Sequence, residues 1–342
     1  MKVTRQMLHR DLRSRYRLLT IVTSIMSFAW AIKLVNKLAE RLRGQQAIDG
    51  LDIEERYFNS SDGAYRVRVV IYRPAGATGK LPAMLYCHGG GYVTGYPEQF
   101  GEVIERFIKT RPCVVVAPDY RKAFTEPFPA GFNDCYEALL WARDNASELN
   151  IDPDRFMVAG HSAGGGLTAA VTLKVRDTQD VEIAFQMPIY PMIDDTQPQD
   201  PDRDIDSPVW NTRLNRLGWG AYLAALNAQG QAIPAYAAPA RNRDYSNFPP
   251  TITFVGTLEP FHQETAAYVQ ALRDAQVDVM YQEYEGCYHA FDTLGGQAAV
   301  SKEARAFTYD SYAMFYDKYV AGSAEQAAPS PQPGNYQQAA VE

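Results

Sequence analysis

Beyond Gly50, short apolar runs alternate with longer segments of helical periodicity. Residues 65–72 (YRVRVVIY) alternate apolar and polar positions as a half-buried strand does. Other short apolar runs predict strands at residues 82–87, 113–118, 156–159, 183–190, 251–255 and 277–284. Helical patterns lie between several of these runs, for example at residues 132–150 and 163–176. Strands that alternate with helices predict an α/β protein, with a mostly parallel sheet covered by helices on both faces.

One long interval, between Pro191 and Pro250, breaks this alternation. It begins with an acidic, proline-rich stretch (DDTQPQDPDRDIDSP) and continues with an aromatic segment of helical pattern (VWNTRLNRLGWGAYLAAL). We expect an insertion here to lie beyond the carboxyl ends of the strands, where open α/β sheets bind their ligands. The final residues, 322–342, are rich in Ala, Gln and Pro and have no periodicity, so we expect a disordered tail without catalytic residues.

The front of the chain, residues 1–43, has a pattern of its own. Residues 18–32 (LLTIVTSIMSFAWAI) carry no charge, but Lys33 ends this run before it reaches the length of a membrane span. A signal peptide would need a cleavage site, and Ala29-Trp30-Ala31 is a poor one. We favour a single amphipathic helix, because the stripe continues past Lys33 at three- and four-residue steps. Its apolar side would hold Leu18, Ile21, Ile25, Phe28, Ile32, Val35 and Leu42, opposite Thr20, Thr23, Ser24, Ser27 and Ala31.

Composition and charge narrow the class of protein. The 342 residues are 46% hydrophobic and 21% charged, which excludes a disordered, collagenous or small disulfide-stabilised chain. The net charge of −7 argues against a nucleic-acid partner. The charge is divided unevenly, however, because the first 43 residues carry ten Lys and Arg against Asp11 and Glu40. A basic front on an acidic body leaves a membrane partner open for residues 1–43.

The four cysteines, Cys87, Cys113, Cys135 and Cys287, lie far apart, and none belongs to a C-x-x-C pair. We therefore expect buried free thiols and no metal site. Free thiols fit a reducing compartment, so the expected location is the cytoplasm. Export or membrane association through the front segment is the alternative.

Candidate chemistry centres on Gly160-His161-Ser162-Ala163-Gly164, which follows a predicted strand (RFMVA) and opens a predicted helix. This is the context of the G-x-S-x-G nucleophile elbow, a tight turn that exposes a serine above a sheet. Upstream, at the end of another strand, stands His88-Gly89-Gly90-Gly91. Adjacent glycines let backbone N–H groups face a developing oxyanion, and the Ala163 N–H is expected to be a further donor.

A serine nucleophile needs a base, and a base needs an acid that orients it. Among the five histidines, His289 is the best candidate for the base, because it lies in a loop just past the last predicted strand. Glu259 directly follows the strand TITFV, and it stands between serine and histidine in the chain order typical of α/β-hydrolases. We therefore assign it as the acid. The alternatives are the carboxylates Asp194, Asp195 and Glu264.

These residues resemble the hormone-sensitive-lipase-like carboxylesterases, the α/β-hydrolase fold-3 family. The resemblance extends over about residues 65–320 and rests on CHGGGYVTG (87–95), residues 114–145, IDPDRFMVAGHSAGGGL (151–167), IYPMIDD (189–195), WNTRLNRLGWGAYL (210–223), YAAPAR (236–241) and GCYHAFD (286–292). It implies an α/β-hydrolase fold and an ester hydrolase that needs no cofactor. Ser162 would be the nucleophile, His289 the base and Glu259 the acid, with an oxyanion hole from Gly90, Gly91 and Ala163.

The sequence departs from the family's pattern at several positions. The family usually has Asp where Glu259 stands, Asp is common where His161 stands, and Asn is common where Gly166 stands. Its R-L-A-P-E-H-P-F-P motif appears here as RKAFTEPFP at residues 121–129. These changes bear on the choice of substrate more than on the type of reaction.

The resemblance also implies a helical cap, formed by residues 1–50 together with an insertion at about residues 196–248. The catalytic domain would then span residues 51–321. We expect the front apolar stripe to pack over the acyl pocket, beside Trp210, Trp219 and Tyr222, with Tyr92 as a further wall. The predicted function is a serine carboxylesterase for short- to medium-chain acyl esters. The alternatives are a membrane-tethered hydrolase of the same family and a non-catalytic binding protein on the same scaffold. The sequence predicts no oligomeric state.

Overall fold

The computed structural model describes residues 1–44 and 47–322. Eight strands form one sheet in the order β1-β2-β4-β3-β5-β6-β7-β8. β1 and β2 run antiparallel to their neighbours and every other pairing is parallel, which confirms the predicted α/β fold. The strands are β1 Leu51–Asn59, β2 Arg66–Pro74, β3 Leu81–Cys87, β4 Val114–Pro118, β5 Ile151–His161, β6 Ile183–Ile189, β7 Thr251–Gly256 and β8 Val279–Tyr284.

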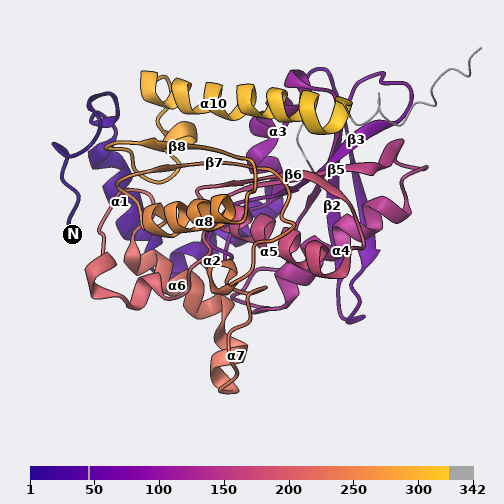
Figure 1. The fold of residues 1–342 in the computed structure, drawn as a ribbon. Coiled ribbons are helices and arrows are strands. Elements are labelled where there is room, and N and C mark those ends of the chain that lie inside the picture. Colours follow the sequence, from indigo (N-terminus) through magenta and orange to yellow (C-terminus); the bar gives the residue numbers. More distant parts are fainter. Residues whose placement is uncertain (45–46, 323–342) are drawn as a thin grey trace, which may run out of the picture.

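Helices cover both faces of this sheet (Figure 1). α3 and α10 lie on one face, and α4, α5 and α8 lie on the other. The α-helices are α1 Tyr16–Met26, α2 Ala29–Ala39, α3 Gly101–Thr110, α4 Ala130–Asp144, α5 Ala163–Thr178, α6 Thr212–Tyr222, α7 Ala224–Ala228, α8 His262–Asp274, α9 Phe291–Leu294 and α10 Ala299–Tyr316. Short helical turns are η1 Arg10–Leu12, η2 Glu40–Leu42, η3 Pro97–Phe100, η4 Gln197–Gln199, η5 Pro201–Arg203, η6 Pro239–Arg241 and η7 Asp317–Ala321.

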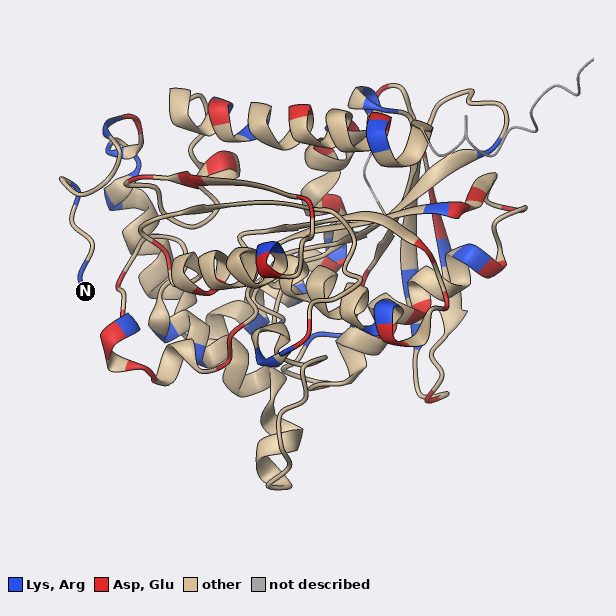
Figure 2. Cartoon of the chain, viewed as in Figure 1, with Lys and Arg blue, Asp and Glu red and all other residues tan. Residues whose placement is uncertain are grey.

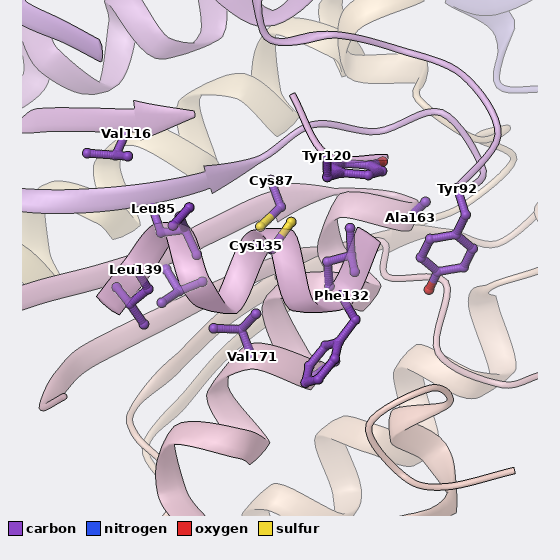
Figure 3. Packing of buried hydrophobic residues seen from close by; sticks show 14 of the residues in the cluster. Leu85, Cys87, Tyr92, Val116, Tyr120, Phe132, Cys135, Leu139, Ala163 and Val171 are labelled. Carbon is purple, nitrogen blue, oxygen red and sulfur yellow. The ribbon is translucent and has the colours of Figure 1, made fainter. Parts of the chain in front are cut away.

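The central strands are buried on both faces, and this explains their unbroken apolar runs. Every residue of β4 and β7 is buried, and so are the last six of β3. Figure 3 shows how side chains of β3, such as Leu85, pack against Leu139 of α4 and Val171 of α5. The opposite face packs against Phe107 of α3 and Tyr312 of α10. Burying each of these large side chains contributes about 1.5–3 kcal/mol, so the parallel core fixes the strand ends that carry the site.

β1 was not predicted from the sequence. Its residues (LDIEERYFN) are charged at several positions, and the strand has no fully buried residue. As the first strand in the sheet order it pairs only with β2, so its pattern lacks the apolar run of a central strand.

The front segment forms two helices, so the prediction of one continuous amphipathic helix was wrong. α1 and α2 meet at Ser27 and Phe28 with a bend of 97°. The extended backbone of Phe28 separates the two helices. The hydroxyls of Thr23 and Ser27 donate to the carbonyls of Leu19 and Thr23, a local bonding pattern that bends helices. Across the described residues no single helix is long and apolar enough to cross a membrane, whereas the bent pair together meets that test of length and composition.

The front segment also packs in the opposite sense to the prediction. Thr23, Ser27 and Ala31 are buried, together with Ile32, whereas most of the apolar stripe faces outward. Small side chains let the helix backbone approach the body closely, and hydrogen bonds then fix it. Thr23 Oγ1 accepts from Val209 N (2.7 Å), and Asn36 Nδ2 donates to Val93 O (2.8 Å).

Between β6 and β7, residues 190–250 form the insertion that contains η4, η5, α6, α7 and η6. Figure 1 shows α6 beside α1 and α2 at one end of the molecule. The Phe128 N–H donates to Tyr222 O (2.8 Å), which ties the end of α6 to the segment before α4. Except for Gly322, the predicted disordered tail lies outside the described residues.

Candidate active site

Ser162 stands in a sharp turn between β5 and α5. Its backbone has φ 61° and ψ −122°, a strained conformation for a residue with a side chain. The turn needs glycines on both sides. A Cβ on Gly160 or Gly164 would overlap the Cys87 carbonyl of the neighbouring strand. The local geometry is therefore that of a nucleophile elbow.

Ser162, His289 and Glu259 come together at the carboxyl ends of three strands. His289 Nε2 lies 2.9 Å from Ser162 Oγ. On the other side of the ring, His289 Nδ1 is hydrogen-bonded to Glu259 Oε2. All three residues are buried. A carboxylate that accepts a hydrogen bond from Nδ1 keeps the imidazole proton on Nδ1. Nε2 is then free to accept the serine proton.

Glu259 is oriented by its own turn after β7, because its Oε1 accepts the Gly256 N–H at 3.0 Å. The other candidate acids are engaged elsewhere. Glu264 accepts the N–H groups of Ile193 and Asp194 and pairs with Arg203. Asp194 bonds Thr196 and Arg203, and Asp195 pairs with Arg241. The structure therefore places Glu259, and none of these alternatives, on the histidine.

Aromatic rings enclose His289. Tyr190 and Phe261 present their edges or faces at 4.9 and 5.0 Å between ring centroids, and Trp210 lies at 6.4 Å. Asp292, the hydrogen-bond partner of Tyr190, was not predicted from the sequence. The Tyr190 hydroxyl donates to Asp292 Oδ1 (3.0 Å), and burial raises the pKa of Asp292 to about 6. The position of Asp292, three residues after His289 in the GCYHAFD motif, is the signal that could have identified it.

The glycine loop after β3 lies beside the serine. A Cβ on Gly89 would lie 3.5 Å from Ser162 Cβ, so this loop approaches the nucleophile closely. Gly90 and Gly91 have φ of 127° and 59°, values that favour glycine. Ala163 is the first residue of α5, where a backbone N–H has no partner within its own helix. Gly89 and Ala163 therefore adjoin Ser162, and Gly90 and Gly91, which are expected to supply the other oxyanion donors, directly follow Gly89 in the loop.

A buried polar cluster supports the glycine loop, and it too was missed from the sequence. The His88 ring stacks on Tyr120 with centroids 4.1 Å apart, and Tyr120 OH donates to His88 O (3.0 Å). Lys122 Nζ lies 3.0 Å from Asp119 Oδ1 and 3.1 Å from His88 Nε2. Burial, and then the Lys122 charge, hold the pKa of His88 well below its usual range. A neutral His88 accepts from Lys122 at Nε2 and donates from Nδ1 to Gly89 O (2.8 Å).

The remaining histidines have other partners. His161 Nδ1 is 2.8 Å from Tyr86 OH, and burial lowers the pKa of His161 to about 3. His262 Nε2 pairs with Glu283 at the surface, and His9 lies beside Asp11. Within the described ranges, no group of three or more His, Cys, Asp or Glu is arranged to hold a metal ion, and the four cysteines are free and buried.

The four aromatic residues predicted to bind substrate separate into two sets. Trp210 lies against the glycine loop, because a Cβ on Gly91 would overlap its ring. Tyr92 stacks on Tyr222 at 4.0 Å and contacts Trp219 at 5.4 Å, and its hydroxyl donates to Met192 O (2.7 Å). Trp210 is thus the one beside the candidate oxyanion hole, whereas Trp219 and Tyr222 pack behind Tyr92.

The candidate nucleophile is largely buried. Ser162 is only 7% exposed. A large cavity of about 770 Å³ lies elsewhere, lined by Asp194, Arg241, Tyr245 and Glu264 among others, and no residue of the candidate triad lines it. Because no triad residue contributes to its lining, this cavity is not the place where an acyl group would meet Ser162.

Comparison with known proteins identifies the family. Residues 84–293 match the sequence profile described as the alpha/beta hydrolase fold. The chain belongs to the α/β-hydrolase family. The match confirms the resemblance to the fold-3, hormone-sensitive-lipase-like group.

Relatives of this α/β-hydrolase have names that describe esterases. It is 34% identical over 234 residues to the carboxylesterase NlhH of Mycobacterium tuberculosis, across 67% of this chain and 72% of that protein. It is 29% identical to an arylesterase of Saccharolobus solfataricus, across 66% and 73%.

Solved structures agree with this grouping. The chain is similar to a bacterial heroin esterase, with a TM-score of 0.81 and 29% identity over 92% of this chain and 99% of the other. Esterase LipW from Mycobacterium marinum follows with a TM-score of 0.79 and 26% identity, over 92% and 97%. The names of all four proteins describe ester hydrolases.

Proposed function

We propose that this α/β-hydrolase is a serine carboxylesterase that acts on short- to medium-chain acyl esters through Ser162, His289 and Glu259. The observation that carries the proposal is the hydrogen-bonded series from Glu259 through His289 to Ser162, which ends beside the glycine loop. The names of the relatives support carboxylic ester hydrolysis as the reaction.

The reaction follows from the positions of these groups. Ser162 Oγ attacks the ester carbonyl while His289 Nε2 takes its proton. The N–H groups of Gly90, Gly91 and Ala163 stabilise the oxyanion of the tetrahedral intermediate. As that intermediate collapses, the ester C–O bond breaks and His289 gives its proton to the departing alcohol. A water molecule, deprotonated by the same histidine, then attacks the acyl-enzyme. As the second tetrahedral intermediate collapses, its bond to Ser162 Oγ breaks, His289 returns the proton to Oγ, and the acid is released.

The restriction to short and medium acyl chains is supported by the aromatic residues that pack at the glycine loop. Trp210 covers Gly91, and Tyr92 is buried between the glycine loop and α6. Bulky aromatic rings beside the oxyanion glycines leave little room for a long acyl chain.

The test is a series of p-nitrophenyl esters from acetate to palmitate, with wild type and two serine variants. Ser162→Ala removes the nucleophile, whereas Ser311→Ala changes a buried serine of α10 and is the matched control. We expect kcat/KM to be highest between acetate and octanoate, to vanish in Ser162→Ala and to persist in Ser311→Ala. A maximum at palmitate would refute the chain-length proposal alone. Wild-type turnover in Ser162→Ala would refute the mechanism.

A further inference from the structure

The outer surface of α1 and α2 carries an exposed apolar face. Isolated exposed hydrophobic residues are ordinary, but a contiguous group is not. On α1 the residues follow an i, i+3, i+4, i+7 stripe, and the rings of Phe28 and Trp30, 6.5 Å apart, occupy the bend that leads to α2. We name these nine residues the N-terminal apolar face, and each is 36–63% exposed: Leu18, Ile21, Val22, Ile25, Phe28, Trp30, Leu34, Val35 and Leu38.

Basic residues accompany this face. Lys33 and Lys37 are exposed on α2 between its apolar residues, and Arg17 is exposed at the start of α1. From the cap, the exposed Arg213 extends its guanidinium over the Phe28 ring at 4.8 Å. The first 43 residues hold two acidic residues against ten basic ones. Figure 2 shows Lys and Arg recurring along the N-terminal segment and its helices.

The geometry fits a helix pair that lies on a membrane and does not cross it. Each helix has 11 residues, about 16 Å of length, whereas a bilayer core of about 30 Å needs about 20 residues. The inner side is fixed to the folded body through the hydrogen bonds of Thr23 with Val209 and of Asn36 with Val93. Only the outer side is therefore available to lipid.

We propose that the N-terminal apolar face binds the surface of an anionic lipid bilayer, with its apolar side chains in the acyl boundary and its lysines at the phosphate level. Apolar residues interleaved with Lys and Arg on a short helix are typical of interfacial membrane helices. A second copy of this chain is the less favourable occupant, because pairing two such faces would bring two basic segments together.

The N-terminal apolar face lies close to the candidate active site. Val209 directly precedes Trp210, and Val93 follows the glycine loop, so both anchors of the helix pair adjoin the candidate active site. A membrane-bound enzyme would thus meet esters that partition into lipid at the cap. This inference goes beyond the proposed function and does not depend on it.

Vesicle co-sedimentation of the full chain tests the proposal. The vesicles are phosphatidylcholine alone and phosphatidylcholine with phosphatidylglycerol. One variant, Ile21→Gln/Ile25→Gln/Leu34→Gln, replaces three apolar side chains by glutamine, which is a good helix former. A second, Lys33→Gln/Lys37→Gln, removes two charges. Matched controls on other surfaces are Leu294→Gln/Met314→Gln and Lys109→Gln/Lys302→Gln, all at exposed positions.

We expect wild type to bind the anionic vesicles and to dissociate with salt. The triple variant should lose more than about 100-fold in partitioning, because each apolar side chain contributes several-fold. The double lysine variant should lose about 25-fold, since each basic residue contributes about fivefold near an anionic surface. The controls should bind as wild type does.

Three results of the vesicle assay would overturn the proposal: no binding to either vesicle, equal binding to neutral and anionic vesicles, or equal losses in the controls. A dimer in light scattering that the triple variant dissociates would also overturn it, because the face would then serve a second copy. Hydrolysis of a soluble acetyl ester is measured for all variants, so that a failure of membrane binding can be told apart from a failure of the proposed catalysis. We expect that hydrolysis to match wild type.

Discussion

Replacing Glu259 by Gln examines the least conventional member of the candidate triad. Glu259 Oε1 accepts the Gly256 N–H, and Oε2 faces His289 Nδ1. A glutamine that keeps its carbonyl oxygen on Gly256 must present its NH₂ group to Nδ1. The reversed orientation would set two donors against each other at Gly256, which costs about 1–3 kcal/mol. In the favoured orientation Nδ1 becomes the acceptor, so Nε2 carries the proton and cannot take one from Ser162.

The expected loss follows from this wrong tautomer. A comparable carboxylate-to-amide change in a serine protease lowers kcat by about 10⁴, which corresponds to about 5.5 kcal/mol of transition-state stabilisation. We therefore expect Glu259→Gln to lose roughly three to four orders of magnitude in kcat while the fold is kept. Glu259→Asp keeps the charge but shortens the reach by one methylene, so it should retain an intermediate rate.

Steady-state hydrolysis of p-nitrophenyl butyrate, with urea unfolding beside it, measures both properties. The matched control is Glu264→Gln, another buried carboxylate, which bonds Ile193 N and Asp194 N. That variant should lose stability and keep most of its kcat. If Glu259→Gln kept more than a tenth of the wild-type kcat, or if Glu264→Gln lost as much, the assignment of the acid would be wrong.

Three further outcomes are expected. Gly91→Ala should lower kcat by about 100-fold, because its φ of 59° and the Trp210 ring both exclude a methyl group and so displace an oxyanion donor; an unchanged kcat would contradict this. Trp210→Ala should change KM for longer esters, whereas Trp219→Ala should mainly lower stability, by about 3–5 kcal/mol, and the reverse pattern would contradict the placement of these rings. Burial raises the pKa of Asp292 to about 6, so the folded state holds its proton more tightly than the unfolded state, and stability from this group falls as pH rises from about 4 to 6. Urea titrations of wild type and Asp292→Asn should show the variant gaining stability relative to wild type across that window, and parallel curves would contradict it.

The sequence predicted the parallel core well because its signals are local. β4 and β7 are fully buried, so their apolar runs required no knowledge of partners. The nucleophile turn could be predicted equally well. Gly160 and Gly164 must be glycines, because a Cβ at either position would overlap the backbone of the neighbouring strand. β1 was missed because an edge strand can keep charged residues.

The front segment shows where such reasoning fails. A stripe of apolar residues indicates that a helix has two sides, but it does not say which side meets the protein. Here the small residues Thr23 and Ser27 allow close packing against the body, and a hydrogen bond between Thr23 and Val209 stabilises it. That partner lies 186 residues away in the chain, so no local pattern could reveal it.

The candidate acid was predicted from chain order and from its position just after a strand. Only long-range contacts distinguish it from the three alternative carboxylates. Glu264 lies one helical turn beyond Glu259, yet its carboxylate is directed to the backbone at Ile193. Asp292 and Lys122 were not predicted for the same reason, because their partners Tyr190 and His88 lie far away in the sequence, just after β6 and β3.

The central claim is that Ser162 forms a covalent acyl-enzyme. The most direct test is intact and peptide mass spectrometry after incubation with a fluorophosphonate, which traps an activated serine. We predict one adduct per chain, located on the peptide that contains Ser162, with none in Ser162→Ala and a greatly slowed reaction in His289→Ala. An unmodified wild-type chain, or an adduct on another residue, would contradict the account.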